Sequence, residues 1–346
     1  MLQSVKTKML FLLLMAVLLI LTVLFSLHTG QIAVSVDTIF YEWSRALGFS
    51  PAGSAPAPDQ RAVLWFIRMP RVTVAILTGA AFAAAGAVMQ GVFANPLADP
   101  GIIGVSAGAS FGAVICISLG LTSLSLYYMP MFALIGALAS VAAALALTFR
   151  HGRIPPMTLL LAGVAVSMFL GAITNGLLTF MNEYNLREFL FWMVGGLDYR
   201  RWEHVGIAAL PILLGIFLLC LLARHLNALA LGENEAKSLG MNVLLYRAIF
   251  LFTASLVTAT AVCVSGMIGF VGLVVPHITR MLMGPDHRIL IPASALLGAL
   301  FLLLCDTLGR TIAPPAEIRV GIMTALIGAP YFLYLIRRMR KEGGDA

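Results

Sequence analysis

Continuously apolar stretches of about 20 residues recur along the whole chain, and they constrain its fold more than any other feature. A helix needs about 20 such residues to cross the hydrocarbon core of a bilayer, whereas a membrane β-barrel shows shorter segments of alternating polarity. Only 11% of the residues are charged, against about 25% in soluble proteins, so the chain cannot cover itself with water-facing surface. The sequence therefore predicts an all-α, polytopic membrane protein.

About ten membrane spans can be placed along the chain, which we expect to form a single membrane domain over residues 1–346. Two of them, 101–120 and 270–284, are weak because Gly, Pro and the pair His277 and Arg280 interrupt them. The first apolar run follows Lys6 and Lys8 and is too long for the core of a signal peptide, so we interpret it as a span. The expected spans are 9–28, 70–92, 101–120, 129–149, 156–181, 205–223, 246–268, 270–284, 289–309 and 319–336.

The distribution of basic residues favours an orientation with both termini in the cytoplasm. In this arrangement all the lysines and 13 of the 22 basic residues lie inside, as the positive-inside rule requires. The segments 29–67 and 182–204 then lie outside; the first holds a possible short helix at Val36–Leu47, and the second holds the apolar patch FLFWMVGGL. The formal charge of +7 is spread over loops and termini without a basic face, so we expect no nucleic-acid partner.

Residues 224–247, here called the central segment, form the longest polar interruption between two apolar runs. Gly232 and Gly240 punctuate it and can take backbone conformations that other residues avoid, so the pattern predicts two short helices meeting at a turn. An amphipathic helix on the membrane surface is one interpretation. The other, which we prefer, is a docking surface for a soluble partner. A phosphate-binding loop is excluded because Ala236 precedes Lys237 where that motif needs glycine.

Few charged residues that could carry chemistry lie in or beside the expected spans: Asp306 near the end of the span 289–309, Glu317 just before the last span, and Arg280 and His277 in the span 270–284. No two of them form an evident acid/base pair, which argues against a proton-coupled pump and against a membrane enzyme. The cysteines, Cys116, Cys220, Cys263 and Cys305, are isolated in apolar runs without metal-ligand spacing, so structural thiols are expected. We therefore predict no catalytic residue, no metal site and no cofactor on this chain.

From about Arg68 to the C-terminus, several motifs resemble the FecCD-type permeases in order and spacing. They are RMPRVTVAILTGAAFAAAGAVMQGVFANPLADPGIIGVSAGA, FWMVGGLDYRRW, LALGENEAKSLGMN, SGMIGFVGLVVPHITRMLMGPDHR and EIRVGIMTALIGAPYFLYLI. These permeases are the membrane subunits of ABC importers for ferric siderophores, haem and cobalamin. The resemblance implies a homodimer with a central pathway, two cytoplasmic ATPase subunits that hold ATP and Mg, and an external substrate-binding protein.

The resemblance also assigns roles to positions in this sequence. LALGENEAKSLGMN resembles the coupling helices that sit in grooves on the ATPases, through Leu229, Leu231, Gly232, Glu233, Glu235, Ala236, Lys237, Leu239 and Gly240. FWMVGGL resembles a short helix that gates the outer mouth, and residues 191–197 are here called the gate segment. The span before it mixes small, apolar and a few polar residues. The expected pathway and gate residues are Val166, Met168, Phe169, Thr174, Asn175, Phe191, Trp192, Met193, Gly195 and Gly196.

Arg68, Arg71 and Arg310 match arginines that pair with acidic residues of the binding protein. Arginine suits bidentate contacts with carboxylates, which also fits the absence of lysine from the outer side. The alternative is that each arginine anchors a span to lipid headgroups.

These observations predict the permease subunit of an ATP-driven iron-chelate importer in the bacterial cytoplasmic membrane, working by alternating access. Haem or cobalamin as cargo remains an alternative within the family, as does a heterodimer with a paralogous permease. An ion-coupled secondary transporter would need paired carboxylates in its spans, and an enzyme acting on lipids would need clustered Asp or His; neither pattern is found.

Overall fold

A computed structural model describes residues 5–30, 32, 34–50, 55–150 and 152–343. Its described elements are helices without a β-strand, which confirms the all-α prediction. The α-helices are α1 (Val5–His28), α2 (Val36–Ala46), α3 (Pro58–Val63), α4 (Met69–Val92), α5 (Val105–Ser118), α6 (Tyr128–Thr148), α7 (Pro156–Thr179), α8 (Glu183–Met193), α9 (Trp202–Leu221), α10 (Ala223–Ala230), α11 (Glu233–Ser238), α12 (Val243–Ser265), α13 (Val271–Met283), α14 (His287–Thr311) and α15 (Val320–Gly343). Short helical turns η1 (Leu64–Arg68), η2 (Pro100–Ile103) and η3 (Leu121–Ser123) link some of them.

Among the described residues, seven helices are long and apolar enough to cross a membrane. Three shorter apolar helices, α5, α13 and the stretch 320–334 of α15, occupy the remaining predicted spans. Two of the three are the spans that the sequence marks as weak. A glycine at positive φ precedes each of these two: Gly104 separates the turn η2 from α5, and Gly266 begins the non-helical stretch between α12 and α13.

The second span begins earlier than predicted. Residues 58–67 were expected in an outer loop, but α3, the π-helical turn η1 and α4 form one continuous helix over Pro58–Val92. Pro58 occupies the first turn, where its missing N–H costs nothing. Pro70 lacks an N–H and crowds the preceding turn, and η1 widens the helix directly before it.

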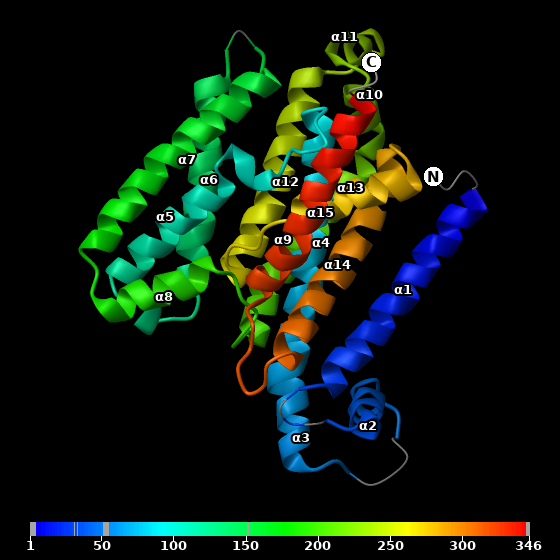
Figure 1. The fold of residues 1–346 in the computed structure, drawn as a ribbon, viewed down its shortest axis with the longest axis vertical. Helices are drawn as coiled ribbons and strands as arrows, with labels where there is room; N and C mark the ends of the chain where they lie inside the picture. Colours follow the sequence, from blue (N-terminus) through cyan, green and yellow to red (C-terminus); the bar gives the residue numbers. More distant parts are fainter. Residues whose placement is uncertain (1–4, 31, 33, 51–54, 151, 344–346) are drawn as a thin grey trace.

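Helix α4 lies at the centre of the fold, and most of its residues are buried. It packs against α14, α12, α13 and α9. Small residues permit this close approach: a Cβ at Gly86 would overlap the carbonyl of Gly272 on α13, and one at Gly79 would overlap that of Gly298 on α14. Helices α5, α6 and α7 pack on one another as a second group, visible in green beside the central helices (Figure 1).

The two ends of the molecule differ in character. Helices α10 and α11 lie at one end, where α15 also finishes, whereas α2, α3 and α8 lie at the other (Figure 1). The chain is thus arranged so that the central segment is exposed at one end and the gate segment lies toward the other.

Candidate functional site

A buried ion cluster joins several elements near the end that holds α3 and α8. Arg71, in the first turn of α4, lies 2.8 Å from Asp306 of α14 and 2.8 Å from Glu317. It also lies 3.3 Å from Asp198, just after the gate segment. Asp306 is 1% exposed and takes a second cation, Arg310, at 3.3 Å. One buried carboxylate therefore stands between two guanidinium groups.

The remaining contacts of Arg68 and Arg310 go to backbone carbonyls and a hydroxyl. Arg68 donates to the carbonyls of Leu27 and His28 at the end of α1 and to that of Ile32 beyond it. Arg310 donates to the hydroxyl of Ser26 at 2.6 Å. These bonds attach the end of α1 to α4 and α14.

This cluster contains the three arginines that the resemblance assigns to a binding protein. Arg68, Arg71 and Arg310 are all buried and bonded within the chain, so their docking role stays a prediction without support in the described contacts. Arg71 and Asp306 meet across 235 positions of sequence, a buried ion pair that was not predicted.

The gate segment packs between the end of α12 and the start of α15. The N–H of Gly196 donates to the carbonyl of Ser265 at the end of α12 (2.8 Å), and that of Gly321 in α15 donates to Gly195 (3.3 Å). Arg319, just before α15, donates to the carbonyl of Phe191 at 2.7 Å, and its guanidinium lies 4.6 Å from the centre of the Phe191 ring. A movement of this segment would therefore be transmitted to α12 and α15.

Gly195 gives a direct test of this packing. Its φ is +73°, and a Cβ there would overlap the carbonyl of Met267, so we expect Gly195→Ala to cost about 1–3 kcal/mol of stability. Gly206→Ala is the matched control, because nothing lies within 4 Å of its position. Thermal unfolding of both variants in detergent measures the difference. Equal melting temperatures would show that the gate segment tolerates rearrangement.

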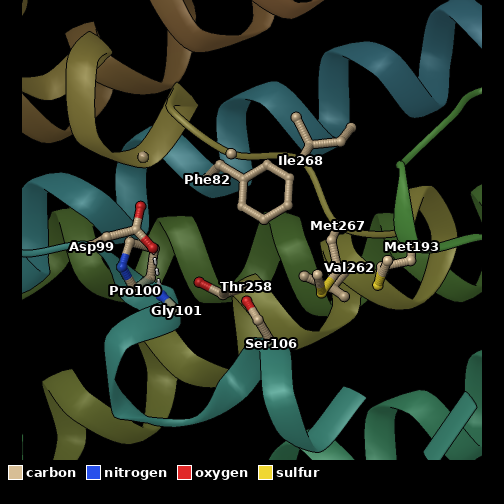
Figure 2. Close-up of a pocket in the computed structure, with 12 residues that line it drawn as sticks. Phe82, Asp99, Pro100, Gly101, Ser106, Met193, Thr258, Val262, Met267 and Ile268 are labelled. Atoms are coloured by element: carbon tan, nitrogen blue, oxygen red, sulfur yellow. Dashed lines mark hydrogen bonds between the residues drawn. The ribbon is translucent and has the colours of Figure 1, made fainter. Parts of the chain in front are cut away.

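A small cavity of about 250 Å³ lies beside the gate segment, next to the non-helical stretch that separates α12 from α13. Figure 2 shows its lining: Phe82, Met193, Val262, Met267 and Ile268 supply apolar surface, and Asp99, Ser106 and Thr258 supply oxygen atoms. The carboxylate of Asp99 accepts a hydrogen bond from the N–H of Gly101 at 2.7 Å. Pockets for drug-sized ligands measure about 300–1,000 Å³, so this cavity alone is too small for a large cargo.

A larger cavity, about 1020 Å³, opens at the end of the molecule that holds the ion cluster. The lining of this larger cavity is rich in cationic and aromatic side chains, from residues both before and after the gate segment in the sequence. Glu317 and Asp198 of the ion cluster also line it. The gate residue Phe191 lines this cavity, and Met193 lines the smaller one. The gate segment thus stands between two cavities. Trp192, Gly195 and Gly196 are buried in its packing and line neither of them.

The predicted pathway residues of α7 lie mostly on a face that none of the described residues covers. Met168 is 72% exposed, Phe169 and Asn175 are exposed, and Val166 is partly so. Thr174 is buried within the chain, so its place on the pathway stays a prediction that this arrangement does not support. The opposite side of α7 packs on α5, α6 and η2, with Gly163 against the backbone of Ile103. The exposed face therefore remains available to a second subunit.

The central segment folds as predicted, into α10 and α11 with a turn between them. Gly232 (φ +126°) and Gly240 (φ +79°) take the left-handed backbone region that favours glycine. Leu229 and Ala236 pack inward, whereas the expected coupling residues Leu231, Glu235, Lys237 and Leu239 are exposed. These four side chains give α11 and its flanks a mixed apolar and charged outer surface.

Two polar links attach this surface to the membrane helices. Glu233 lies 2.7 Å from Lys237 and 3.2 Å from Arg247 of α12, and these partners hold the pKa of Glu233 below its ordinary value. Arg247 also donates to the carbonyl of Ile154, just before α7, at 2.9 Å. Arg247 was not among the predicted site residues, although a cation inside a predicted membrane span is a sequence signal for a functional role.

The second link runs through α10. The side-chain amide of Asn227 donates to Asp286 at 2.7 Å, and its oxygen accepts from the backbone N–H of His287 at 2.9 Å. Hydrogen bonds from Arg288 hold the pKa of Asp286 well below its usual range, so this carboxylate stays ionised. The described residues contain no group of three or more His, Cys, Asp or Glu placed to hold a metal ion.

Comparison with known proteins places these features in a family. The FecCD transport family matches residues 18–338. The chain is 45% identical to a cobalamin import permease, BtuC, of Halobacterium salinarum, over 78% of this chain and 72% of that protein. It is 40% identical to a hemin transport permease, HmuU, of Yersinia pestis (94% and 95% covered) and 40% identical to an Fe(3+)-citrate import permease, YfmE, of Bacillus subtilis (96% and 96%). Among solved structures, an ABC transporter assigned to the metal-chelate type, in an inward-facing conformation, matches with a TM-score of 0.84 and 33% identity over 95% of this chain and 99% of that one.

Proposed function

Since this chain belongs to the FecCD transport family, we propose that it carries a ferric siderophore or a related iron chelate into the bacterial cytoplasm. Its family consists of the membrane permease subunits of ABC transporters, so the chain is a multi-pass permease and is not itself an enzyme; ATP hydrolysis belongs to a separate subunit. The iron-chelate cargo is supported by the Fe(3+)-citrate permease, at 40% identity. The hemin and cobalamin permeases are similarly close, and these two cargoes are the alternatives.

The observation that carries the proposed mechanism is the position of the two functional segments. The central segment presents exposed Leu231, Glu235, Lys237 and Leu239 at one end, which suits docking on a cytoplasmic ATPase. The gate segment lies between two cavities toward the opposite end. ATP-driven closure of the ATPases would move the first segment, and the packed helices would transfer that movement to the second.

A second copy of the chain completes the proposed transporter. Of the two cavities beside the gate segment, one is too small for a large cargo and the other lies at the end of the subunit, whereas α7 exposes Met168, Phe169 and Asn175 along a free face. We expect two such faces to enclose the pathway and an external binding protein to deliver cargo at the end that holds α2, α3 and α8. The site of action is then the bacterial cytoplasmic membrane.

Reconstitution into proteoliposomes tests this proposal. The permease is combined with its ATPase and binding protein, and uptake of a labelled ferric siderophore, Fe(3+)-citrate, hemin and cobalamin is measured with and without ATP. We expect ATP-dependent uptake of an iron chelate only. Uptake of hemin or cobalamin alone would assign the cargo to the alternative, and uptake driven by a proton or sodium gradient without the ATPase would overturn the ABC mechanism.

A further inference from the structure

Two basic side chains on α13, His277 and Arg280, make no hydrogen bond or ion pair with any described residue. Nε and Nη2 of Arg280 and Nδ1 of His277 are shielded from solvent and have no partner. The two residues are three positions apart on one helix, so their side chains are neighbours. Nε2 of His287, which interacts electrostatically with Arg280, is also buried without a partner.

An arginine in this position requires an anion. The guanidinium does not lose its charge in proteins, and a charge shielded from water is stable only when it is paired. The described arginines that are buried all have partners: Arg71 in the ion cluster, Arg68 and Arg310 at the end of α1, and Arg247 at Glu233 and Ile154, whereas the half-buried Arg280 has none for its shielded Nε and Nη2. Arg280 is therefore an exception that calls for an explanation.

The described carboxylates at this end of the chain, and Asp99 of the small cavity, do not supply that anion. Glu233 is bonded to Lys237 and Arg247, and Asp286 is bonded to Arg288 and Asn227. Asp99 accepts from Gly101 and lines the small cavity, and Glu235 is exposed on α11. The missing partner of Arg280 therefore comes from outside the described chain.

The depth of Arg280 indicates the kind of partner. It lies three residues before the end of α13, or about 5 Å along the helix, and Asp286 in the turn that follows contacts α10 of the central segment. Its neighbours Met281 and Leu282 are apolar and 41% and 37% exposed, as at a lipid-facing surface. An arginine this close to the end of a membrane helix can extend its guanidinium to the phosphates of the lipid headgroups.

We propose that His277 and Arg280 bind the phosphate of an anionic phospholipid in the leaflet on the side of the central segment. The planar guanidinium can donate to two phosphate oxygens, and the imidazole can add a third donor. Basic pockets between membrane helices on the cytoplasmic side are suited to such headgroups. This site goes beyond the proposed transport function and relies on it only to identify the leaflet as cytoplasmic.

Native mass spectrometry of the full-length chain tests the site without ATPase or cargo, so its failure is separate from that of the transport proposal. The protein is titrated with phosphatidylglycerol and, in parallel, with phosphatidylcholine. We expect wild type to prefer phosphatidylglycerol and Arg280→Gln to weaken that binding at least tenfold, about 1.4 kcal/mol. Arg288→Gln is the matched control, since Arg288 is exposed and paired with Asp286 at the same end. Arg280→Lys keeps the charge, so it should retain the preference for phosphatidylglycerol. If Arg280→Gln does not fold, the lipid preference of Arg280→Lys still tests the proposal.

The outcomes separate the sources of the anion. Equal phosphatidylglycerol binding by Arg280→Gln and Arg288→Gln would overturn the proposal. Displacement of the lipid by inorganic phosphate would assign the site to a soluble anion. Unchanged lipid binding by Arg280→Gln would overturn a lipid site, and weakened binding of this variant in a separate pull-down with the ATPase would then assign Arg280 to a carboxylate of the ATPase.

Discussion

Replacing Asp306 by alanine is expected to destabilise this permease by about 3–5 kcal/mol, the cost of removing one partner from a buried ion pair. Asp306 is 1% exposed and is the shared carboxylate for Arg71 and Arg310. Its removal leaves two buried guanidinium groups near each other with less negative charge between them. Because Arg71 also reaches Glu317 and Asp198, the α14–α15 connection and the segment after the gate should loosen as well.

Glu183→Ala is the matched control for Asp306→Ala. It breaks the exposed pair of Glu183 and Arg187, 2.7 Å apart on α8, which should contribute at most about 1 kcal/mol. Thermal and urea unfolding in the same detergent compare the two variants. If Asp306→Ala lost no more stability than Glu183→Ala, the ion cluster would not hold the outer ends of the helices together.

The membrane helices were predictable because a bilayer imposes a length and a composition that are visible in sequence. The predicted and observed bounds of α12, for instance, differ by about three residues at each end. The continuation of α4 back to Pro58 was not predictable from hydropathy, because Asp59, Gln60 and Arg61 are polar and a proline such as Pro70 is typical of the first turn of a helix. The π-helical turn η1 widens the helix before Pro70 and so accommodates this proline, and such a turn has no simple sequence pattern.

The central segment was also predictable, since Gly232 and Gly240 mark turns by their own conformational freedom. Contacts between distant positions were not. Arg71 with Asp306, and Arg247 with the backbone of Ile154, depend on how α4, α12 and α14 pack, and a backbone carbonyl carries no sequence signal at all. The burial of Arg68, Arg71 and Arg310 was missed for the same reason: their partners come from elements far away in the chain.

Arg247 is positioned to pass movement from the central segment to the helices of the proposed pathway. It is buried, and one side chain joins Glu233 of α11 to its own helix α12 and to the carbonyl of Ile154, two residues before α7 begins. Hydrogen bonds that involve a charged group contribute about 1.5–3 kcal/mol each. Loss of this side chain would therefore leave α11 attached to α7 and α12 by far weaker interactions.

We expect Arg247→Met to reduce ATP-driven uptake at least tenfold, while the ATPase still binds and hydrolyses ATP at its basal rate, because the exposed docking residues of α11 are unchanged. Arg153→Met is the matched control, since Arg153 is an exposed cation in the turn before α7 that makes no side-chain bond with described residues. Uptake and hydrolysis are measured together in proteoliposomes. A double-mutant cycle with Glu233→Gln sharpens the test: the two changes should cost less together than the sum of their separate effects. Strict additivity, or wild-type uptake per ATP in Arg247→Met, would show that coupling does not pass through the pair of Glu233 and Arg247.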